Sequence, residues 1–455
     1  MITFIVRKII PMKKIISIAI FCATTGVLAQ DHFSGIATSR RGGLLNASFN
    51  PAELANLQTD YEVAIIATSV NFSNNRLGYS DLLSDDFEDK IFATDKKVNL
   101  LLDAELMGPG FAIKVQDWAF SFQSKTYAKI NFSEVNPYLG DALTNENYVS
   151  LLNSVVISDG NNQRANGTVW GELAFGVSKI IFEDDTHKFN AGVSMKLLFP
   201  GSYANFGARN FNGTIDIVAG NAELTNATAN LNIAYSGGLA EDFTEFSNYT
   251  SALFGNLNGF AADFGLNYQL KDDEQYKLNA GISLRNIGKM TFKDNNNHAT
   301  NYTLNIPAGE SLNLSQFQNV SNFEDVEEIL LQSGYLTETP LSRDFRVNLP
   351  SLFSAYADLK IVSDFYVTVF GQQKLNEDDG NDQITAQNVL SITPRYATEK
   401  FEVFAPIASN EISGFTAGLG MHVGGFFVGS GSVLTALLAD GEQADFYIGF
   451  RLGFN

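Results

Sequence analysis

Cysteine, proline, histidine and charged residues are all scarce in this sequence. The 455 residues include one Cys, ten Pro and four His, and only 18% are Asp, Glu, Lys or Arg. A single cysteine excludes a disulfide-stapled domain, and the scattered histidines lack the paired spacing of a metal site. The net charge of −20 excludes a basic nucleic-acid-binding protein, so we expect no nucleic-acid partner.

Hydrophobic residues, in contrast, are plentiful. They make up 45% of the chain, and 12% of all residues are aromatic, with 37 Phe beside 38 Gly. This composition can bury a core and therefore excludes a disordered chain. The length allows two or three soluble domains or one large closed sheet.

The N-terminal residues have the features of an export signal. Four basic residues precede an apolar run at 15–28, and Val27 and Ala29 supply the small residues of a cleavage site. The run is shorter than the roughly 20 residues of a spanning helix. We therefore predict a secretory signal peptide over 1–29. Its removal takes away four basic residues, no acidic ones and Cys22, so the net charge of −20 becomes −24.

Most of the remaining chain alternates between apolar and polar residues with period two, which is typical of strands with two unlike faces. Clear examples are 118–123, 191–197, 264–270 and 278–285. In a soluble sandwich the apolar face forms the core. In a transmembrane barrel it faces lipid, and the polar face lines the lumen.

Several features favour the barrel. The strands are long and are separated alternately by short turns and long polar loops, as in outer-membrane barrels. Aromatic residues gather at strand ends and predict a girdle at the membrane interface; they are Tyr127, Phe132, Phe292, Phe401 and Phe404. Together with the export signal, this pattern predicts an all-β, transmembrane, antiparallel up-and-down barrel in the outer membrane of a Gram-negative bacterium.

One stretch allows a different interpretation. Residues 412–439 carry no charge and are long enough for a spanning helix. However, this stretch contains seven glycines, which are costly inside a helix. We interpret it as two strands joined at Gly424 and Gly425, where a positive φ is easily adopted.

The strand pattern extends over residues 61–455 and ends in a closing strand at 446–454. We count 16 wall strands if 209–219 and 222–236 both belong to the wall. The count is 14 if they form a hairpin within a long outer loop. Both counts are even, so both termini of the chain lie on the periplasmic side, where the turns are short.

Two outer loops contain apolar residues at helical spacing. Residues 141–156 carry Tyr148, Leu151 and Leu152, and residues 322–333 begin with acidic residues, as the N-terminus of a helix favours. These helices either cap the barrel mouth or offer a binding surface for an apolar ligand. Tyr148, Leu151 and Leu152 are the candidate ligand surface.

Most acidic residues fall in loops and turns, which predicts a solvated exterior. Divalent cations could bridge such loops to lipopolysaccharide. The loop at 376–382 (NEDDGND) has oxygen ligands of the kind that Ca²⁺ prefers, but its Gly is misplaced for an EF-hand. We therefore predict neither a metal site nor a cofactor.

The segment before the first strand carries a family resemblance. Its FNPAELA stretch places Asn50 to cap a helix that begins at Pro51. This stretch resembles the NPA motif of the FadL/TodX outer-membrane barrels and of a related Bacteroidota branch, which includes the type IX secretion shuttle barrel and uncharacterised DUF5723-like barrels. LRNIGKMTF at 284–292 and NLPSLFSAYADLKI at 348–361 resemble patterns of the same barrels.

The resemblance implies a 14-stranded barrel whose lumen holds an N-terminal plug, here residues 30–60. Asn50, Pro51 and Ala52 would belong to the anchor of the plug. It also implies transport of hydrophobic compounds, as in the best-known members. Gly108, Pro109 and Gly110 interrupt a strand. They form either a wall kink, which in family members opens sideways to the membrane, or an ordinary bulge or turn.

The sequence lacks the usual motifs of an enzyme. It contains no HExxH, GxSxG or phosphate-binding loop motif, and its carboxylates lie in solvated loops. We therefore expect no catalytic residues. The favoured hypothesis is a plugged channel for uptake of small hydrophobic compounds. The alternative is a non-transporting barrel subunit of an outer-membrane assembly or secretion complex. The expected partners are outer-membrane lipid and lipopolysaccharide, with a hydrophobic small molecule or other envelope proteins.

Overall fold

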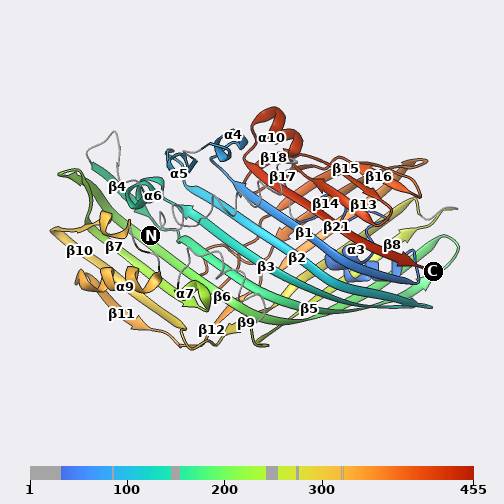
Figure 1. Ribbon diagram of the computed structural model, residues 1–455, viewed down its shortest axis with the longest axis horizontal. Helices are drawn as coiled ribbons and strands as arrows, with labels where there is room; N and C mark the ends of the chain where they lie inside the picture. The colour runs from blue at the N-terminus through green and yellow to red at the C-terminus, as the bar shows by residue number, and fades with distance from the viewer. Residues whose placement is uncertain are drawn as a thin grey trace.

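The computed structural model is a closed antiparallel barrel (Figure 1). It describes residues 32–84, 87–144, 154–241, 255–272, 276–318, 320 and 322–455. The described chain has 14 wall strands, and the pairing of Thr68 in the first with Ile448 in the last closes the wall. The predicted all-β transmembrane barrel is thus confirmed.

Each wall strand pairs with the next one along the chain, which is the up-and-down order. Three wall strands are interrupted, at Leu349–Ser351, at Ala405–Pro406 and at Gly418, and each is therefore described by two labels. In wall order the strands are β1 (Tyr61–Asn74), β2 (Val98–Val115), β3 (Trp118–Val135), β5 (Gln163–Glu183), β6 (His187–Val218), β8 (Gly259–Leu270), β9 (Leu278–Phe292), β12 (Phe345–Asn348) with β13 (Leu352–Val362), β14 (Phe365–Lys374), β15 (Val389–Ala397), β16 (Phe401–Phe404) with β17 (Ile407–Asn410), β18 (Gly414–Ala417) with β19 (Leu419–Val423), β20 (Phe426–Ser430) and β21 (Gln443–Phe454).

Strand β6 explains why the count is 14 and not 16. Its first part pairs with β8, whereas residues from Tyr203 onward pair with β7 (Asn221–Ser236). Strand β7 pairs in turn with β10 (His298–Asn313), and β10 pairs with β11 (Leu336–Pro340). Together with β4 (Ser154–Asp159), which pairs with the end of β6, these strands extend the sheet beyond the wall.

The two faces of the wall strands have the polarity of a membrane barrel. In β8, Phe264 and Leu266 point outward and are 50% and 56% exposed, whereas Asp263 and Asn267 point inward and are buried. A soluble sandwich would bury the apolar face. The exposed apolar face and buried polar face therefore decide between the two interpretations.

The predicted aromatic girdle is wrong for most of its members. Phe132, Phe292 and Phe404 are buried inside the barrel, and the ring of Tyr127 stacks on the inward-facing Trp170 at 4.6 Å. Only Phe401 is well exposed, at 41%. The sequence pattern correctly places most of these aromatic residues near strand ends, but most of them face the lumen and not the lipid.

The two ends of the barrel differ. Short turns near Asp117, Asp184, Ser363, Thr398 and Gly424 join strands at the end that we call the plug end. Long connections cross the opposite end, the cap end. Most of the chargeless stretch is indeed two wall strands, β18 with β19 and then β20, and Gly424 between them has a φ of 61°. The prediction is wrong for its last residues, because Val433–Ala439 form a short helix. Among the described residues, no helix has the length and apolar character needed to cross a membrane.

Short helices occupy the plug segment and the cap end. The predicted helix at 322–333 is present, and Asn322 caps it by accepting from the Asp325 amide. The prediction for 141–156 is wrong at its C-terminal end, since Val155 lies in a strand. Residues 141–144 belong to a described helix, and 145–153 lie outside the described residues. The helices are α3 (Leu44–Phe49), η1 (Pro51–Asn56), α4 (Tyr79–Leu82), α5 (Phe87–Lys90), α6 (Pro137–Thr144), α7 (Gly238–Glu241), η2 (Leu314–Phe317), α9 (Phe323–Gln332) and α10 (Val433–Ala439).

Closure of the barrel can be tested by cross-linking. We expect Thr68→Cys with Ile448→Cys to form a disulfide in folded protein, because cross-strand partners have Cα atoms within the roughly 4.4–6.8 Å that a disulfide spans. Non-reducing electrophoresis of the oxidised protein gives the readout. Thr68→Cys with Leu452→Cys is the control, since Leu452 pairs with Val63 instead. Equal cross-linking of both pairs would contradict the register.

Candidate functional site

The segment from His32 to Asp60, here called the plug segment, lies inside the barrel at the plug end, with α3 surrounded by wall strands (Figure 1). Its apolar side chains are almost completely enclosed, with Phe33, Ile36, Ala52 and Leu54 all at 0% exposure. This burial is a property of the tertiary fold, because an isolated segment of this length has no core of its own.

The wall holds the NPA motif in a seat made of glycines. Cβ atoms added at Gly192, Gly265 and Gly281, on β6, β8 and β9, would overlap Asn50 or Pro51. Without side chains there, the plug backbone approaches the wall directly. The Asn50 side-chain amide donates to the Leu266 carbonyl at 3.0 Å and to the Ile282 carbonyl at 3.3 Å.

Asn50 therefore has two roles. Its side-chain oxygen accepts from the Ala52 amide at 3.0 Å and so caps η1, with Pro51 at the first position, as the sequence predicts. Its side-chain amide anchors the cap to the wall. The carbonyl of Ala52 accepts from Ser178 of β5 at 3.1 Å. The NPA residues thus fix the plug segment to three neighbouring wall strands and to β5.

Glu53, the next residue, places a carboxylate among neutral donors. It accepts from the side-chain amides of Asn56, Asn267 and Asn279 at 2.8, 2.9 and 2.8 Å, and from the Tyr356 hydroxyl. Hydrogen bonds to an ionised acceptor are stronger than neutral ones. Glu53 therefore connects the plug to β8, β9 and β13 without a basic partner.

On the other side of the lumen, Arg395 of β15 holds the first turns of the plug segment. Its guanidinium, which is buried, donates to the carbonyls of Gly35 and Thr38 at 2.8 and 3.2 Å. Asp358 and Glu402 lie 3.8 and 3.5 Å from it and balance its charge. A buried charge of this kind is stable only when it is paired.

Further ion pairs fill the lumen above the plug. Lys125 binds Glu105 at 2.9 Å, and Lys196 binds Asp263 at 2.8 Å. Asp103 pairs with Lys129 and lies 3.0 Å from His32 of the plug segment. The cavity that remains between these groups is about 60 Å³, so the lumen is closed in this conformation.

The connection between β14 and β15 closes the lumen from the cap end. Arg164, which is fully buried, reaches into it from β5 and donates to the Gln383 carbonyl at 3.2 Å and to the Thr385 hydroxyl at 2.7 Å. The Tyr203 hydroxyl donates to the Asn381 carbonyl at 2.8 Å. The Gly380 carbonyl also accepts from Arg164, so the acidic stretch 376–382 is partly packed against an arginine, where the sequence had predicted a solvated loop.

Beyond this closure lies an apolar cavity, here called the cap pocket. It has a volume of about 60 Å³ and is enclosed by α6, η2, α9 and the extended strands β5, β6, β7 and β10. Gln163 is the one polar residue among the described residues of its lining. The apolar lining includes Phe211, Leu231, Leu304, Phe317 and Leu330.

A buried carboxylate docks α9 onto the strands of the cap pocket. Glu327 lies 2.7 Å from His298 and accepts from the hydroxyls of Tyr235, at 3.4 Å, and Tyr302. The hydrogen bond with Glu327 raises the pKa of His298, while partial burial opposes this shift.

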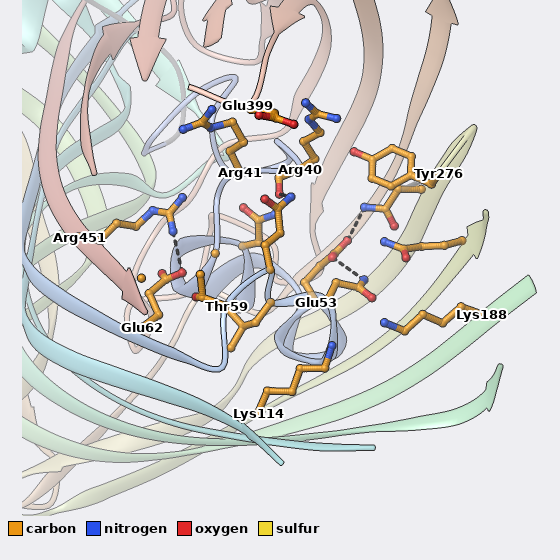
Figure 2. Close-up of a pocket in the computed structure, with 18 of the residues that line it drawn as sticks. Arg40, Arg41, Glu53, Thr59, Glu62, Lys114, Lys188, Tyr276, Glu399 and Arg451 are labelled. Atoms are coloured by element: carbon orange, nitrogen blue, oxygen red, sulfur yellow. Dashed lines mark hydrogen bonds and ion pairs between the residues drawn. The ribbon is translucent and has the colours of Figure 1, made fainter. Parts of the chain in front are cut away.

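A second, larger cavity of about 570 Å³ opens at the plug end, and we call it the plug-end pocket (Figure 2). Six basic and four acidic side chains line it. Two of the acids are paired within the pocket, Glu62 with Arg451 at 2.6 Å and Glu183 with Lys271 at 2.9 Å. Burial lowers the pKa of Arg41, and nearby Glu402 opposes this effect.

The predicted wall kink lies away from the contacts of the NPA motif. Gly108 and Pro109 lie in β2 where its pairing with β3 shifts register, and the Pro109 carbonyl accepts from Ser124 at 3.0 Å. Gly110 faces Leu44 of the plug segment. β2 continues through this irregularity. Tyr148, Leu151 and Leu152 lie outside the described residues.

Several central residues were missed in the sequence. Glu53 stood within the quoted FNPAELA stretch, and Arg164, Arg395 and Glu402 stand at inward positions of strands. A charged residue at an inward position was the available signal. Their partners, however, lie up to several hundred residues away, and period two does not pair distant strands.

The glycine seat predicts a specific sensitivity to a single methyl group. We expect Gly265→Ala to displace Asn50 and to lower the local unfolding free energy of the plug segment by about 1–3 kcal/mol, the usual cost of overpacking. Amide hydrogen exchange of residues 44–56 measures this energy.

Gly371→Ala is the matched control, because the nearest atom to its added Cβ is 3.9 Å away, in Leu390. An unchanged exchange rate of residues 44–56 in Gly265→Ala, or an equal increase of this rate in both variants, would contradict the role of the glycine seat.

The Glu327–His298 pair predicts that the docking of α9 depends on pH. Because the folded pKa of His298 is raised, its contribution is fully present below the unfolded value of about 6.5 and is lost as pH rises through the folded value. We expect protection factors of residues 323–332 to fall over that range.

Glu327→Gln should abolish this dependence, whereas Glu328→Gln, at an exposed neighbouring position, should retain it. A pH dependence that survives in Glu327→Gln would assign the effect to another group.

Comparisons with known proteins place the chain in a family. No curated protein matches its sequence. The toluene transporter TbuX of Ralstonia pickettii is 9% identical, with a TM-score of 0.41 over 90% of this chain and 93% of that one. A Pseudomonas aeruginosa FadL homologue is 9% identical, with a TM-score of 0.26 over 90% and 94%.

The translocator domain of the autotransporter NalP from Neisseria meningitidis is also 9% identical, with a TM-score of 0.33 over 88% of this chain and 91% of that one. These values are low, and the fold described above rests on strand pairing alone. The sequence model that matches covers residues 51–431, from Pro51 of the NPA motif to the end of β20. The chain therefore belongs to DUF5723, a family of unknown function.

Proposed function

We propose that this protein is an outer-membrane barrel of a Gram-negative bacterium that takes up small hydrophobic compounds and is closed at rest by its plug. The exposed apolar face of the wall strands supports the membrane location, since Phe264, Leu266 and their neighbours need a lipid environment. The export signal expected at residues 1–29 supports a route to the outer membrane.

The cap pocket is the observation that carries the proposal. Its lining is apolar apart from Gln163, and it lies at the cap end, where long connections gather. Small-molecule sites are typically concave and mostly apolar. A dry cavity lined by Leu and Phe binds small apolar molecules without loss of hydrogen bonds. A first binding step for an apolar compound fits this chemistry, and the cavity of about 60 Å³ would have to widen to hold one, since ligand pockets span roughly 300–1,000 Å³.

Passage beyond the cap pocket requires movement in this proposal. The connection held by Arg164 and the plug segment held by Asn50 and Glu53 both obstruct the lumen. Their hydrogen bonds are individually weak enough to exchange, at roughly 0.5–3 kcal/mol each. Displacement of these two segments would be the gated step.

The filled lumen also favours a second candidate function. A barrel whose interior is closed by paired charges such as Lys196 with Asp263 suits a non-transporting subunit of an envelope assembly. In that case the cap-end strands β7, β10 and β11, rather than the cap pocket, would make the contacts.

Ala208→Leu tests uptake directly. Ala208 lines the cap pocket and is 3% exposed, so the larger side chain should occupy the cavity. We expect uptake of apolar compounds by cells or proteoliposomes to fall about tenfold, the effect of roughly 1.4 kcal/mol of lost binding.

Ala262→Leu, on the outward face of β8, is the control and should leave uptake unchanged. If deletion of the whole protein changes no uptake across a compound panel, the channel proposal is wrong. Stoichiometric co-purification with another envelope protein would then support the second candidate.

A further inference from the structure

Among the residues that the structure describes, the lining of the plug-end pocket has more basic side chains than acidic ones. After the Glu62–Arg451 and Glu183–Lys271 pairs are set aside, Arg40, Arg41, Lys114 and Lys188 remain, with Glu53 and Glu399 as the other lining acids. Glu53 is already saturated by neutral donors, as described above. This excess is local, because the whole chain has a net charge of −20.

Lys188 shows most clearly that the charge is uncompensated. Its side chain is 7% exposed, and its ammonium donates to a single acceptor, the Ala55 carbonyl, at 3.1 Å. An ammonium has three N–H groups, and no described carboxylate forms an ion pair with the other two, although Glu183 and Glu53 act on Lys188 from further away. Burial of a cation without a counter-ion is costly, and an anion in the pocket would remove that cost.

The other three cations are available in the same way. The Lys114 ammonium forms no hydrogen bond or ion pair within the described part of the chain. Arg40 donates to the Tyr366 hydroxyl and Arg41 to the Thr398 carbonyl, at 3.0 and 2.9 Å. These acceptors are neutral, and neither guanidinium forms an ion pair with a described carboxylate, although Glu402 lies near Arg41.

The arrangement suggests what the ligand must look like. Figure 2 shows the two arginines on one side of the pocket and the two lysines on the other, where Lys114 and Lys188 extend from β2 and β6. A ligand that meets both pairs needs at least two anionic groups. The volume of about 570 Å³ lies within the range of small-molecule sites, and wall strands, turns and the plug segment enclose it.

We propose that the plug-end pocket binds a small organic anion with two or more carboxylate or phosphate groups. The ligand would join plug segment to wall, since Arg40 and Arg41 belong to the plug segment and Lys114 and Lys188 to the barrel. The site is separate from the cap pocket and does not depend on uptake of hydrophobic compounds.

The test is calorimetric titration of the full-length protein in a non-ionic detergent with citrate and with pyrophosphate, which represent the two chemistries. Acetate at matched ionic strength is the reference. We expect saturable binding of at least one probe at one site per chain. The affinity should fall steeply between about 0.05 and 0.5 M salt, because salt shortens the Debye length and so weakens the attraction between the ligand and the basic side chains.

Lys114→Gln is the key variant, because Lys114 has no structural partner to lose. We expect it to weaken binding about tenfold. Lys188→Gln keeps a donor for Ala55 and should weaken binding similarly. Lys293→Gln, at an exposed position outside the pocket, is the matched control and should have no effect.

Three outcomes would overturn the proposal. The first is that neither probe binds saturably. The second is that Lys293→Gln weakens binding as much as Lys114→Gln, which would mean diffuse ionic attraction. The third is that poly-glutamate binds while citrate and pyrophosphate do not, which would assign the pocket to an acidic polypeptide. None of these outcomes bears on uptake through the cap pocket.

Discussion

The structure depends on one constraint: a closed barrel in lipid places most charged wall residues inside and leaves outward charges, such as Lys179 and Lys289, toward the strand ends. Outward positions such as Phe264 and Leu266 are apolar, and inward positions such as Asp263 carry the charge. Inside a narrow, filled lumen these charges are far from bulk water and are stable only when they are paired. The ion pairs of the lumen are therefore a consequence of the fold and not evidence of catalysis.

The plug segment satisfies the same constraint from within. It supplies carbonyls to Arg395, a carboxylate to the amides around Tyr356, and backbone to the glycine seat on β6, β8 and β9. The seat differs from the ion pairs, because it works by the absence of side chains. Close approach of two backbones fixes the position of the NPA residues, and hydrogen bonds of Asn50 then fix their orientation.

The two ends of the molecule differ in chemistry for a related reason. The cap end is built from strands and helices that continue beyond the wall, so it forms a core of its own around the cap pocket. The plug end is where the plug segment meets the first turns of the wall. Its basic residues come from both parts, and the carboxylates there do not balance them. The proposed apolar and anionic ligands follow from this division.

The sequence by itself determined the barrel, its use of nearly all of residues 61–455, the sides of the turns and the helix at 322–333, because period-two alternation and turn residues are local signals. It also identified Asn50 and Pro51 as a helix start. Only the tertiary structure decided that there are 14 strands, that Phe132 and Phe404 face inward, and that Glu53, Arg164 and Arg395 hold the lumen closed. These features depend on which distant strands become neighbours, and strand alternation carries no information about partners so far apart in the chain.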